Sequence, residues 1–345
     1  MPIMITGSTG FIGRHVCAAL TRDSHPILAM LRDPDGQIQS LRASVDKLGG
    51  NSELVSPIAG DLDQGGPNNP DSLVSLTSII HCGARFGWQL DKENARRTNV
   101  GGSLAMAGLA RRHNCRLVSI SGFMLENTGH LEQLGVYGET PDSVDWNRVY
   151  RKVGAYEASK IEAALQLRAH SREQDLDHIE IQPATVAGHS GNGELDPTQP
   201  LHTLLDNLRS GKLTMIPGSP DHWLPLVAVD HLAETIARAA TTDRPPSRLL
   251  ALDPGTPNLQ GLLAIAAKAF NRRPPKYHIP IPVLAALLRI PGIPALMNTQ
   301  AETLHFLQPT RFDTSATDLF LEEQKLSRPP IGEVIYATAN YVQSA

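Results

Sequence analysis

The sequence predicts an α/β protein built on a doubly wound parallel sheet, with a smaller and irregular α/β lobe. Three observations lead to this fold class. A glycine-rich stretch, residues 7–13, lies between a short apolar run and a helical pattern. Apolar runs then alternate with helical patterns to about residue 183, which favours parallel strands joined by right-handed crossovers. Beyond that point the alternation weakens, and residues 188–200 are rich in Gly, Asn, Asp and Pro.

Six short apolar runs are expected to form the main strands of the sheet. They cover residues 1–6, 27–31, 53–59, 78–82, 116–120 and 178–182. Helical patterns follow the glycine-rich stretch at 14–20 and span about 92–113 and 154–172. Each helix lies between two expected strands, as the crossover helices of a parallel sheet do.

The second half of the chain is expected to be less regular. Helices are predicted at about 201–210, 231–240 and 258–270, and strands at 213–216, 225–229 and 249–252. Asp230 directly precedes the second of these helices and is predicted to cap it.

Composition excludes several functional classes. The 345 residues carry a formal net charge of -4, which gives no electrostatic reason to expect nucleic acid or an anionic membrane as partner. Cys17, Cys82 and Cys115 lie in apolar runs at wide spacing, so we expect buried thiols and no metal site. The first strand and the glycine-rich turn begin at the N-terminus, so no signal peptide is expected. Prolines interrupt the most apolar stretch, 279–297, so it is not expected to span a membrane. A cytoplasmic protein without a membrane span is expected.

The glycine-rich stretch predicts a dinucleotide site. It follows a strand, opens a helix and is followed by a second strand within about 30 residues, the context of the Rossmann-type fingerprint. Gly7 permits the tight turn, Gly10 lets the backbone approach a pyrophosphate, and Gly13 lets the helix pack closely on the strand. Free N–H groups at the start of the helix would bind the phosphates.

The end of the second strand indicates which cofactor binds. An NAD-preferring site usually presents Asp or Glu there to bind the ribose hydroxyls. This sequence has Leu31 followed by Arg32, whose guanidinium is suited to a 2′-phosphate. NADP(H) is therefore the preferred cofactor, while Asp33, one residue further on, leaves NAD(H) possible.

A tyrosine and a lysine far along the chain indicate the chemistry. Tyr156 and Lys160 are four residues apart in a predicted helix, so they share one face. A phenol has a pKa near 10, and a nearby ammonium would lower it toward the range useful for acid/base work. Ser121 follows the fifth strand, where open α/β sheets bind ligands, and its hydroxyl would bind the substrate oxygen.

These motifs together resemble the extended short-chain dehydrogenase/reductase family over most of the chain. The matching segments are 6–13, 60–62, 79–84, 98–102, 118–121, 156–160 and 182–188, with weaker matches at 226–230 and 311–316. The resemblance implies Ser121, Tyr156 and Lys160 as catalytic residues. The cofactor contacts it implies are Gly7, Thr9, Gly10, Phe11, Ile12, Gly13, Arg32, Asp61, Leu62, Gly83, Ala84, Tyr156, Lys160, Pro183, Thr185 and Val186.

Within that family the Leu31-Arg32 ending is similar to NADPH-using reductases, including the thioester-reductase and carbonyl-reductase branch. The sequence also departs from the family pattern. Gln182 replaces an arginine found in many relatives, and Ser121 lacks the following Asp-Glu pair that nucleotide-sugar dehydratases use. The segment 123–153 is long, and its composition suggests a loop that covers the substrate.

The pattern predicts a dinucleotide-binding domain over 1–187, which carries the catalytic residues. A mainly substrate-binding lobe is predicted over 188–345, from which about 225–255 returns to the first domain.

Several residues keep two interpretations. His81 is expected to be a core histidine rather than a ligand, Asn99 either supports the backbone or joins a proton relay, and His189 either contacts substrate or does not. The stretch 279–297 either lines an apolar substrate tunnel or packs a lobe. The arginine pairs 96–97, 111–112 and 272–273 are either solvated charges or a patch for a phosphopantetheine carrier.

The sequence thus predicts an NADPH-dependent oxidoreductase that reduces a ketone, an aldehyde or an acyl thioester. The substrate is expected to be an apolar small molecule, free or bound to coenzyme A or an acyl-carrier protein, and the enzyme a monomer or homodimer. A nucleotide-sugar epimerase or dehydratase is the alternative enzyme. A regulatory protein that senses NADP(H) without turnover is the non-catalytic alternative.

Overall fold

The computed structural model describes residues 1–73, 75–87 and 90–344. Its central feature is an eight-stranded, mostly parallel sheet with strand order β11-β7-β6-β5-β1-β2-β3-β4, which confirms the predicted Rossmann-type α/β fold. The strands are β1 (Ile3–Thr6), β2 (Ile27–Leu31), β3 (Val55–Asp61), β4 (Gly66–Pro67), β5 (Ser78–His81), β6 (Arg116–Ile120), β7 (His178–Pro183) and β11 (Arg248–Ala251).

The strand order reverses beside β1. This strand pairs in parallel with β2 on one side and with β5 on the other, so that Ile3 faces both Ile27 and Ser78. All residues of β1 and β5 are buried, as expected of strands covered by helices on both faces. In such sheets ligands bind beyond the carboxyl ends of the strands at the point of reversal.

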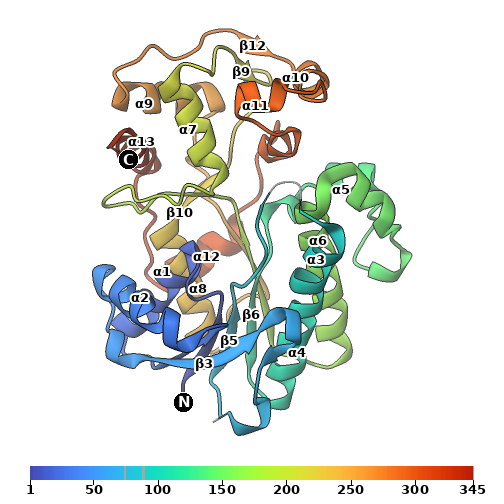
Figure 1. The fold of residues 1–345 in the computed structure, drawn as a ribbon, viewed down its shortest axis with the longest axis vertical. Coiled ribbons are helices and arrows are strands. Elements are labelled where there is room, and N and C mark those ends of the chain that lie inside the picture. The colour runs from blue at the N-terminus through green and yellow to red at the C-terminus, as the bar shows by residue number, and fades with distance from the viewer. Residues whose placement is uncertain (74, 88–89, 345) are drawn as a thin grey trace. The chain divides into compact units, whose positions relative to one another are not determined.

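Helices cover the two faces of this sheet. Figure 1 shows α1, α2 and α8 on one face and α3, α4 and α6 on the other. Their bounds are α1 (Phe11–Arg22), α2 (Pro34–Lys47), α3 (Lys92–Ala95), α4 (Gly102–Arg112), α6 (Trp146–Glu173) and α8 (Val229–Thr241). A π-helical turn, η4 (Arg96–Gly101), joins α3 to α4. The helix predicted at about 92–113 is therefore present, with a π-helical segment between two α-helical ones.

The structure corrects the sequence analysis between β6 and β7. The predicted loop at 123–153 contains η5 (Phe123–Glu126), α5 (Thr128–Leu134), η6 (Pro141–Ser143) and the first turns of α6. Apolar side chains of this segment, including Leu125, Leu134 and Val149, are buried in one cluster. The segment is helical because it has its own apolar faces to bury, which its Gly and Pro content concealed.

Chain contacts divide the protein into two compact units. The first holds Met1–Gln182, Leu232–Leu250 and Ala316–Leu326, and the second holds Pro183–His231, Ala251–Ser315 and Ser327–Ala345. The remaining elements are η1 (Ser52–Leu54), η2 (Leu62–Gln64), η3 (Pro70–Ser72), β8 (Thr185–Ala187), α7 (Pro200–Ser210), β9 (Ile216–Pro217), β10 (Leu226–Ala228), α9 (Leu259–Ala269), β12 (His278–Ile279), α10 (Ile281–Leu287), α11 (Ile293–Met297), η7 (Ala301–Phe306), α12 (Ser315–Glu323) and α13 (Ile331–Ser344).

Two further expectations in the second half are wrong in detail. The strand predicted at 213–216 is reduced to the two residues of β9. Asp230 lies inside the first turn of α8 rather than before it, and its carboxylate accepts hydrogen bonds from the Ser190 amide and hydroxyl. Among the residues that the structure describes, no helix is both long enough and apolar enough to cross a membrane.

Candidate active site

A pocket of about 270 Å³ lies at the carboxyl ends of β1, β2, β3 and β5, in the first unit. Eight residues predicted to contact a cofactor line it: Gly7, Thr9, Gly10, Arg32, Asp61, Leu62, Gly83 and Ala84. The other predicted contacts, among them Phe11, Ile12 and Gly13 in α1, are not among its lining residues. The structure therefore brings together the turn after β1 and the ends of three strands.

The glycines shape this pocket by letting backbones approach closely. Gly7 has φ +69°, and a Cβ there would lie 2.6 Å from the Gly83 nitrogen. A Cβ on Gly13 would lie 2.1 Å from the Gly7 carbonyl oxygen. The helix α1 begins after Gly10 without a side-chain cap, which leaves its first N–H groups for a phosphate. The cradle fits a dinucleotide.

The acidic residue that follows β2, Asp33, has a structural role. Asp33 caps α2: its carboxylate accepts the Gly36 amide at 3.1 Å, and Pro34 occupies the first turn. This start signal was present in the sequence, but α2 was not predicted. Arg32 is exposed at the pocket. An adjoining pocket of about 230 Å³ shares Thr9 and Gln37 with the first and is also lined by Arg14 and Ser40.

An ion pair among the residues that line the dinucleotide pocket was not predicted. The Arg85 guanidinium lies 2.8 Å from the Asp63 carboxylate, and Thr98 donates to the same carboxylate. Although desolvation acts to raise the pKa of Asp63, the hydrogen bonds from Thr98 and Arg85 hold it below its usual value. Asn99 fixes the Arg85 backbone, accepting its N–H at 2.7 Å and donating to its carbonyl at 3.2 Å. These contacts favour the structural interpretation of Asn99.

A buried histidine, His81, supports the pocket wall through Thr6 and Gly83. Gly83 N–H donates to the Thr6 hydroxyl, and that hydroxyl lies 2.8 Å from Nδ1 of His81. Ser103 donates to the Asn99 carbonyl, so it accepts from Nε2 of His81 at 3.0 Å. Burial first, and the Lys160 charge second, lower the pKa of His81 to about 3. A neutral histidine thus holds Gly83 in place.

The predicted Tyr-Lys pair lies on α6. Gly154, with φ 81° and ψ 168°, interrupts this helix, so a new helical segment begins just before Tyr156. The Tyr156 ring packs edge-on against Phe86, with ring centroids 4.7 Å apart. Contrary to the lowering expected from Lys160, burial, with a smaller effect of Glu157, raises the pKa of the phenol. Lys160 donates to the Ile120 carbonyl at 2.5 Å, and burial lowers the pKa of its ammonium to about 8.

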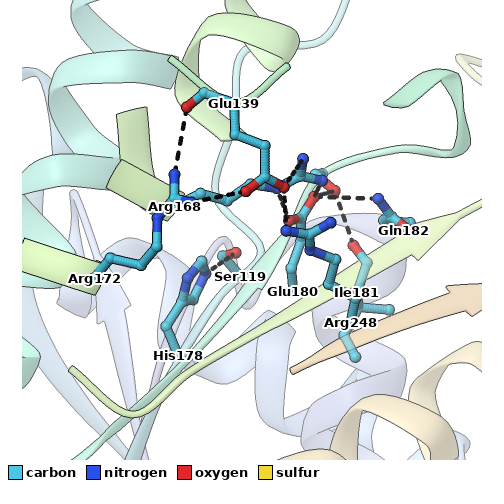
Figure 2. Close-up of polar contacts among 10 residues, drawn as sticks. Ser119, Glu139, Arg168, Arg172, His178, Glu180, Ile181, Gln182 and Arg248 are labelled. Atoms are coloured by element: carbon cyan, nitrogen blue, oxygen red, sulfur yellow. Dashed lines mark hydrogen bonds and ion pairs between the residues drawn. The ribbon is translucent and has the colours of Figure 1, made fainter. Parts of the chain in front are cut away.

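Ser121 follows Ile120 and donates its proton to a buried carboxylate. Its hydroxyl lies 2.5 Å from Oε1 of Glu180, which is 1% exposed on β7. Arg168 of α6 grips the same carboxylate with two N–H groups, at 2.7 and 3.1 Å (Figure 2). Although burial alone would raise the pKa of Glu180, the Arg168 charge and the hydrogen bonds from Arg168 and Ser121 hold it below its usual range.

The polar cluster around Glu180 extends outward. Figure 2 shows Glu139 among three arginines: Arg168 lies 3.4 Å away, Arg172 2.9 Å away, and Arg248 donates to it as well. Sequence reasoning missed this cluster. A charged residue within the apolar strand H-I-E-I-Q was the available signal, because a buried carboxylate needs a cation beside it.

The remaining predicted site residues belong to the second unit. Thr185 and Val186 lie in β8, which pairs in parallel with β10, and Pro183 ends β7. All three are buried. His189 accepts the Gly191 amide at 3.0 Å, and its Nδ1 lies 4.0 Å from the Asp230 carboxylate.

Residues 3–249 match the family model described as the NAD dependent epimerase/dehydratase family. The chain is also 35% identical over 116 residues to the hybrid PKS-NRPS synthetase mycA of Thermothelomyces thermophilus, a match that covers 32% of this chain and 3% of the synthetase. The chain therefore spans only a small part of that relative.

Two other relatives match over longer stretches. The UDP-glucose 4-epimerase of Vibrio cholerae is 25% identical over 81% of this chain and 79% of its own length. The 2-alkyl-3-oxoalkanoate reductase of Stenotrophomonas maltophilia is 24% identical over 68% of this chain and 63% of its own. Among solved structures, the terminal R domain from the myxalamid PKS-NRPS pathway aligns with a TM-score of 0.73 at 20% identity, covering 99% of this chain and 91% of that one.

Proposed function

We propose that this chain, which belongs to the NAD dependent epimerase/dehydratase family, is an NADPH-dependent carbonyl reductase of the extended short-chain dehydrogenase/reductase type. One observation carries this proposal. Lys160 donates a hydrogen bond to the carbonyl of Ile120, the residue before Ser121, so α6 contacts the end of β6. Tyr156, Lys160 and Ser121 therefore belong to the same unit as the dinucleotide pocket.

When bound in the pocket, NADPH would supply the hydride that the carbonyl carbon accepts. Tyr156, whose raised pKa keeps the phenol protonated, donates the proton to the carbonyl oxygen. Lys160 adds a positive charge that favours the phenolate left behind. Ser121 binds the same oxygen, and its proton turns from Glu180 to that oxygen as negative charge develops there. A ketone would yield an alcohol, and a thioester would yield a hemithioacetal whose C–S bond breaks to release an aldehyde and the free thiol.

The preference for NADPH over NADH is supported by the end of β2. Asp33 is occupied as the cap of α2, so its carboxylate is turned to the helix and not to a ribose. Arg32 lines the dinucleotide pocket, and Arg14 and Ser40 line the pocket beside it. These groups suit a 2′-phosphate, since a charge-assisted arginine contact contributes about 1.5–3 kcal/mol.

A titration tests the cofactor. We expect NADPH to bind more tightly than NADH, and Arg32→Ala to weaken NADPH binding by about 10- to 100-fold with little effect on NADH. Quenching of protein fluorescence measures both affinities. Equal loss for the two cofactors would contradict the assignment of Arg32 to the 2′-phosphate.

An apolar acyl-type substrate is supported by the relatives. One is named a 2-alkyl-3-oxoalkanoate reductase, another is a PKS-NRPS synthetase, and Ser121 lacks the Asp-Glu pair of dehydratases. The proposed substrate is either a free small molecule or a thioester of coenzyme A or of an acyl-carrier protein. We also propose a cytoplasmic location, in which Cys17, Cys82 and Cys115 remain free thiols.

The reaction is tested by NADPH oxidation with a panel of ketones, aldehydes and acyl thioesters. We expect saturable turnover that Tyr156→Phe abolishes while NADPH binding is retained. Saturable turnover with a nucleotide sugar alone would overturn the proposal.

A nucleotide-sugar epimerase is the second candidate, because the Vibrio cholerae epimerase matches over most of both chains. An epimerase keeps its cofactor between half-reactions, whereas a reductase exchanges it at every turnover. Absorbance of bound NAD(H) in the purified protein would therefore favour the epimerase.

A further inference from the structure

The second unit contains a pocket of about 290 Å³ that is separate from the dinucleotide pocket. Side chains of α7, α10, α11 and η7 and of the segment after α7 form its walls. Most of them are aliphatic, including Leu204, Met215, Leu284, Leu287, Met297 and Leu304. Among the described residues that line it, Phe306 is the one aromatic residue and Lys212 the one charged residue.

The pocket is not closed by the packing around it. The hydrophobic cluster that α10 and η7 form beside it has three buried side chains, Leu284, Leu288 and Leu304, and the other apolar side chains packed against them are only partly buried. Leu287 on α10 and Met215 in the segment after α7 both line the pocket and remain 38% and 37% exposed. A ligand in the pocket would remove this apolar surface from water.

The lining also indicates the kind of ligand. Leucine and methionine walls adapt to a flexible chain, whereas planar aromatic ligands are favoured by several aromatic partners that this pocket lacks. A protein partner would need an interface of roughly 1,000 Å² or more, far beyond a small concave site. Lys212 is exposed, so its ammonium lies at the rim and is available to an anionic head group.

We propose that this pocket binds a saturated aliphatic chain whose anionic head group pairs with Lys212. The site does not rest on the proposed reduction, because binding requires neither cofactor nor turnover. Failure of the one proposal therefore leaves the other standing.

Calorimetric titration of the full chain with hexanoate, octanoate, decanoate and dodecanoate tests the site. The dissociation constant should fall by up to about fourfold per added methylene until the pocket is full, and then stop falling. Decanol serves as the neutral probe. Lys212→Gln should weaken decanoate by about two- to fivefold and leave decanol unchanged.

A matched pair of variants on α10 locates the binding. Leu287 lines the pocket, whereas Val283 lies on the same helix, is 50% exposed and is not among the lining residues. Leu287→Asp should weaken both decanoate and decanol by at least about tenfold, and Val283→Asp should change neither. Circular dichroism confirms that both variants fold. Absence of binding, affinity independent of chain length, or equal effects of the two variants would overturn the proposal.

Discussion

Glu180 and Arg168 form a buried ion pair directly behind a predicted catalytic hydroxyl. The Glu180 side chain is 2% exposed and that of Arg168 is 10% exposed. Because water reaches neither charge well, each charge depends on the other for its stabilisation. Because Arg168 lowers the pKa of Glu180, the pair stabilises the fold at neutral pH, and this contribution is lost as pH falls through the lowered pKa. The ion pair therefore holds Ser121 at the cost of two buried charges.

Arg168→Met should destabilise the protein by about 3–5 kcal/mol, because it leaves the Glu180 carboxylate buried without a cation. The double variant Arg168→Met/Glu180→Met should cost much less, since no unpaired charge remains and Glu139 keeps Arg172 and Arg248. Urea unfolding of wild type, both single variants and the double variant measures the coupling. Additive losses would show that the two charges do not depend on each other.

Lys160 makes activity depend on pH in a defined direction. Burial lowers its pKa to about 8, so the ammonium is present below that pH and is lost above it. The raised pKa of Tyr156 keeps the phenol protonated over the same range. We therefore expect kcat/KM to fall as pH rises through about 8, by about tenfold for each further pH unit.

Lys160→Arg is the control for this prediction, because a guanidinium stays charged at any accessible pH. Whatever its residual activity, this variant should lack the alkaline fall. A wild-type profile that stays flat well above pH 8 would remove Lys160 as the titrating group.

The residues found by sequence belong to one recognisable motif, whereas the residues that were missed do not. Gly7, Gly10 and Arg32 lie in one short unit whose spacing alone predicts a shared pocket. Arg85 and Asp63 are 22 residues apart, and Ser121 and Glu180 are 59 apart. No local periodicity links such pairs, so their contacts follow from the strand order and not from spacing.

At the level of elements, Gly154 decides where Tyr156 lies. Its φ of 81° and ψ of 168° belong to a region that is essentially restricted to glycine. Gly154→Ala should destabilise the protein by about 1–3 kcal/mol and reduce kcat by displacing Tyr156, two residues further on.

Gly108→Ala is the matched control for Gly154→Ala. Gly108 is exposed within α4, and a Cβ there would meet nothing within 4 Å. This substitution should stabilise the protein by about 0.5–1 kcal/mol and leave kcat unchanged. Thermal unfolding and initial rates measure both variants. Tolerance of alanine at Gly154 would mean that the helix does not depend on that bend.

The sequence predicted strands better than helix boundaries, for a physical reason. The strands β2 and β6 have the predicted bounds because both are short, mostly apolar segments that lie buried within the sheet. The helix α2 was missed because its buried residues are few, Ile38, Leu41 and Val45, in an otherwise polar segment. The start of α6 was missed because a glycine within a helical pattern usually marks a helix end. In the structure Gly154 is instead a bend between two helical stretches.

At the scale of the whole molecule, the two units are interleaved along the chain. Their six segments alternate, so the chain passes from one unit to the other five times. Helices α12 and α13 follow each other near the C-terminus, yet α12 from Ala316 belongs to the first unit and α13 to the second. Neither unit is therefore a continuous piece of chain that can fold by itself.

Interleaving predicts that both units unfold together. Calorimetry should give one transition, and NADPH, which the first unit is proposed to bind, should move that whole transition upward. At a hundredfold excess over its dissociation constant, NADPH should add about 2.7 kcal/mol to the free energy of unfolding, a rise of a few degrees. Two transitions, of which NADPH shifts one and leaves the other in place, would show that the units unfold independently despite the five crossings.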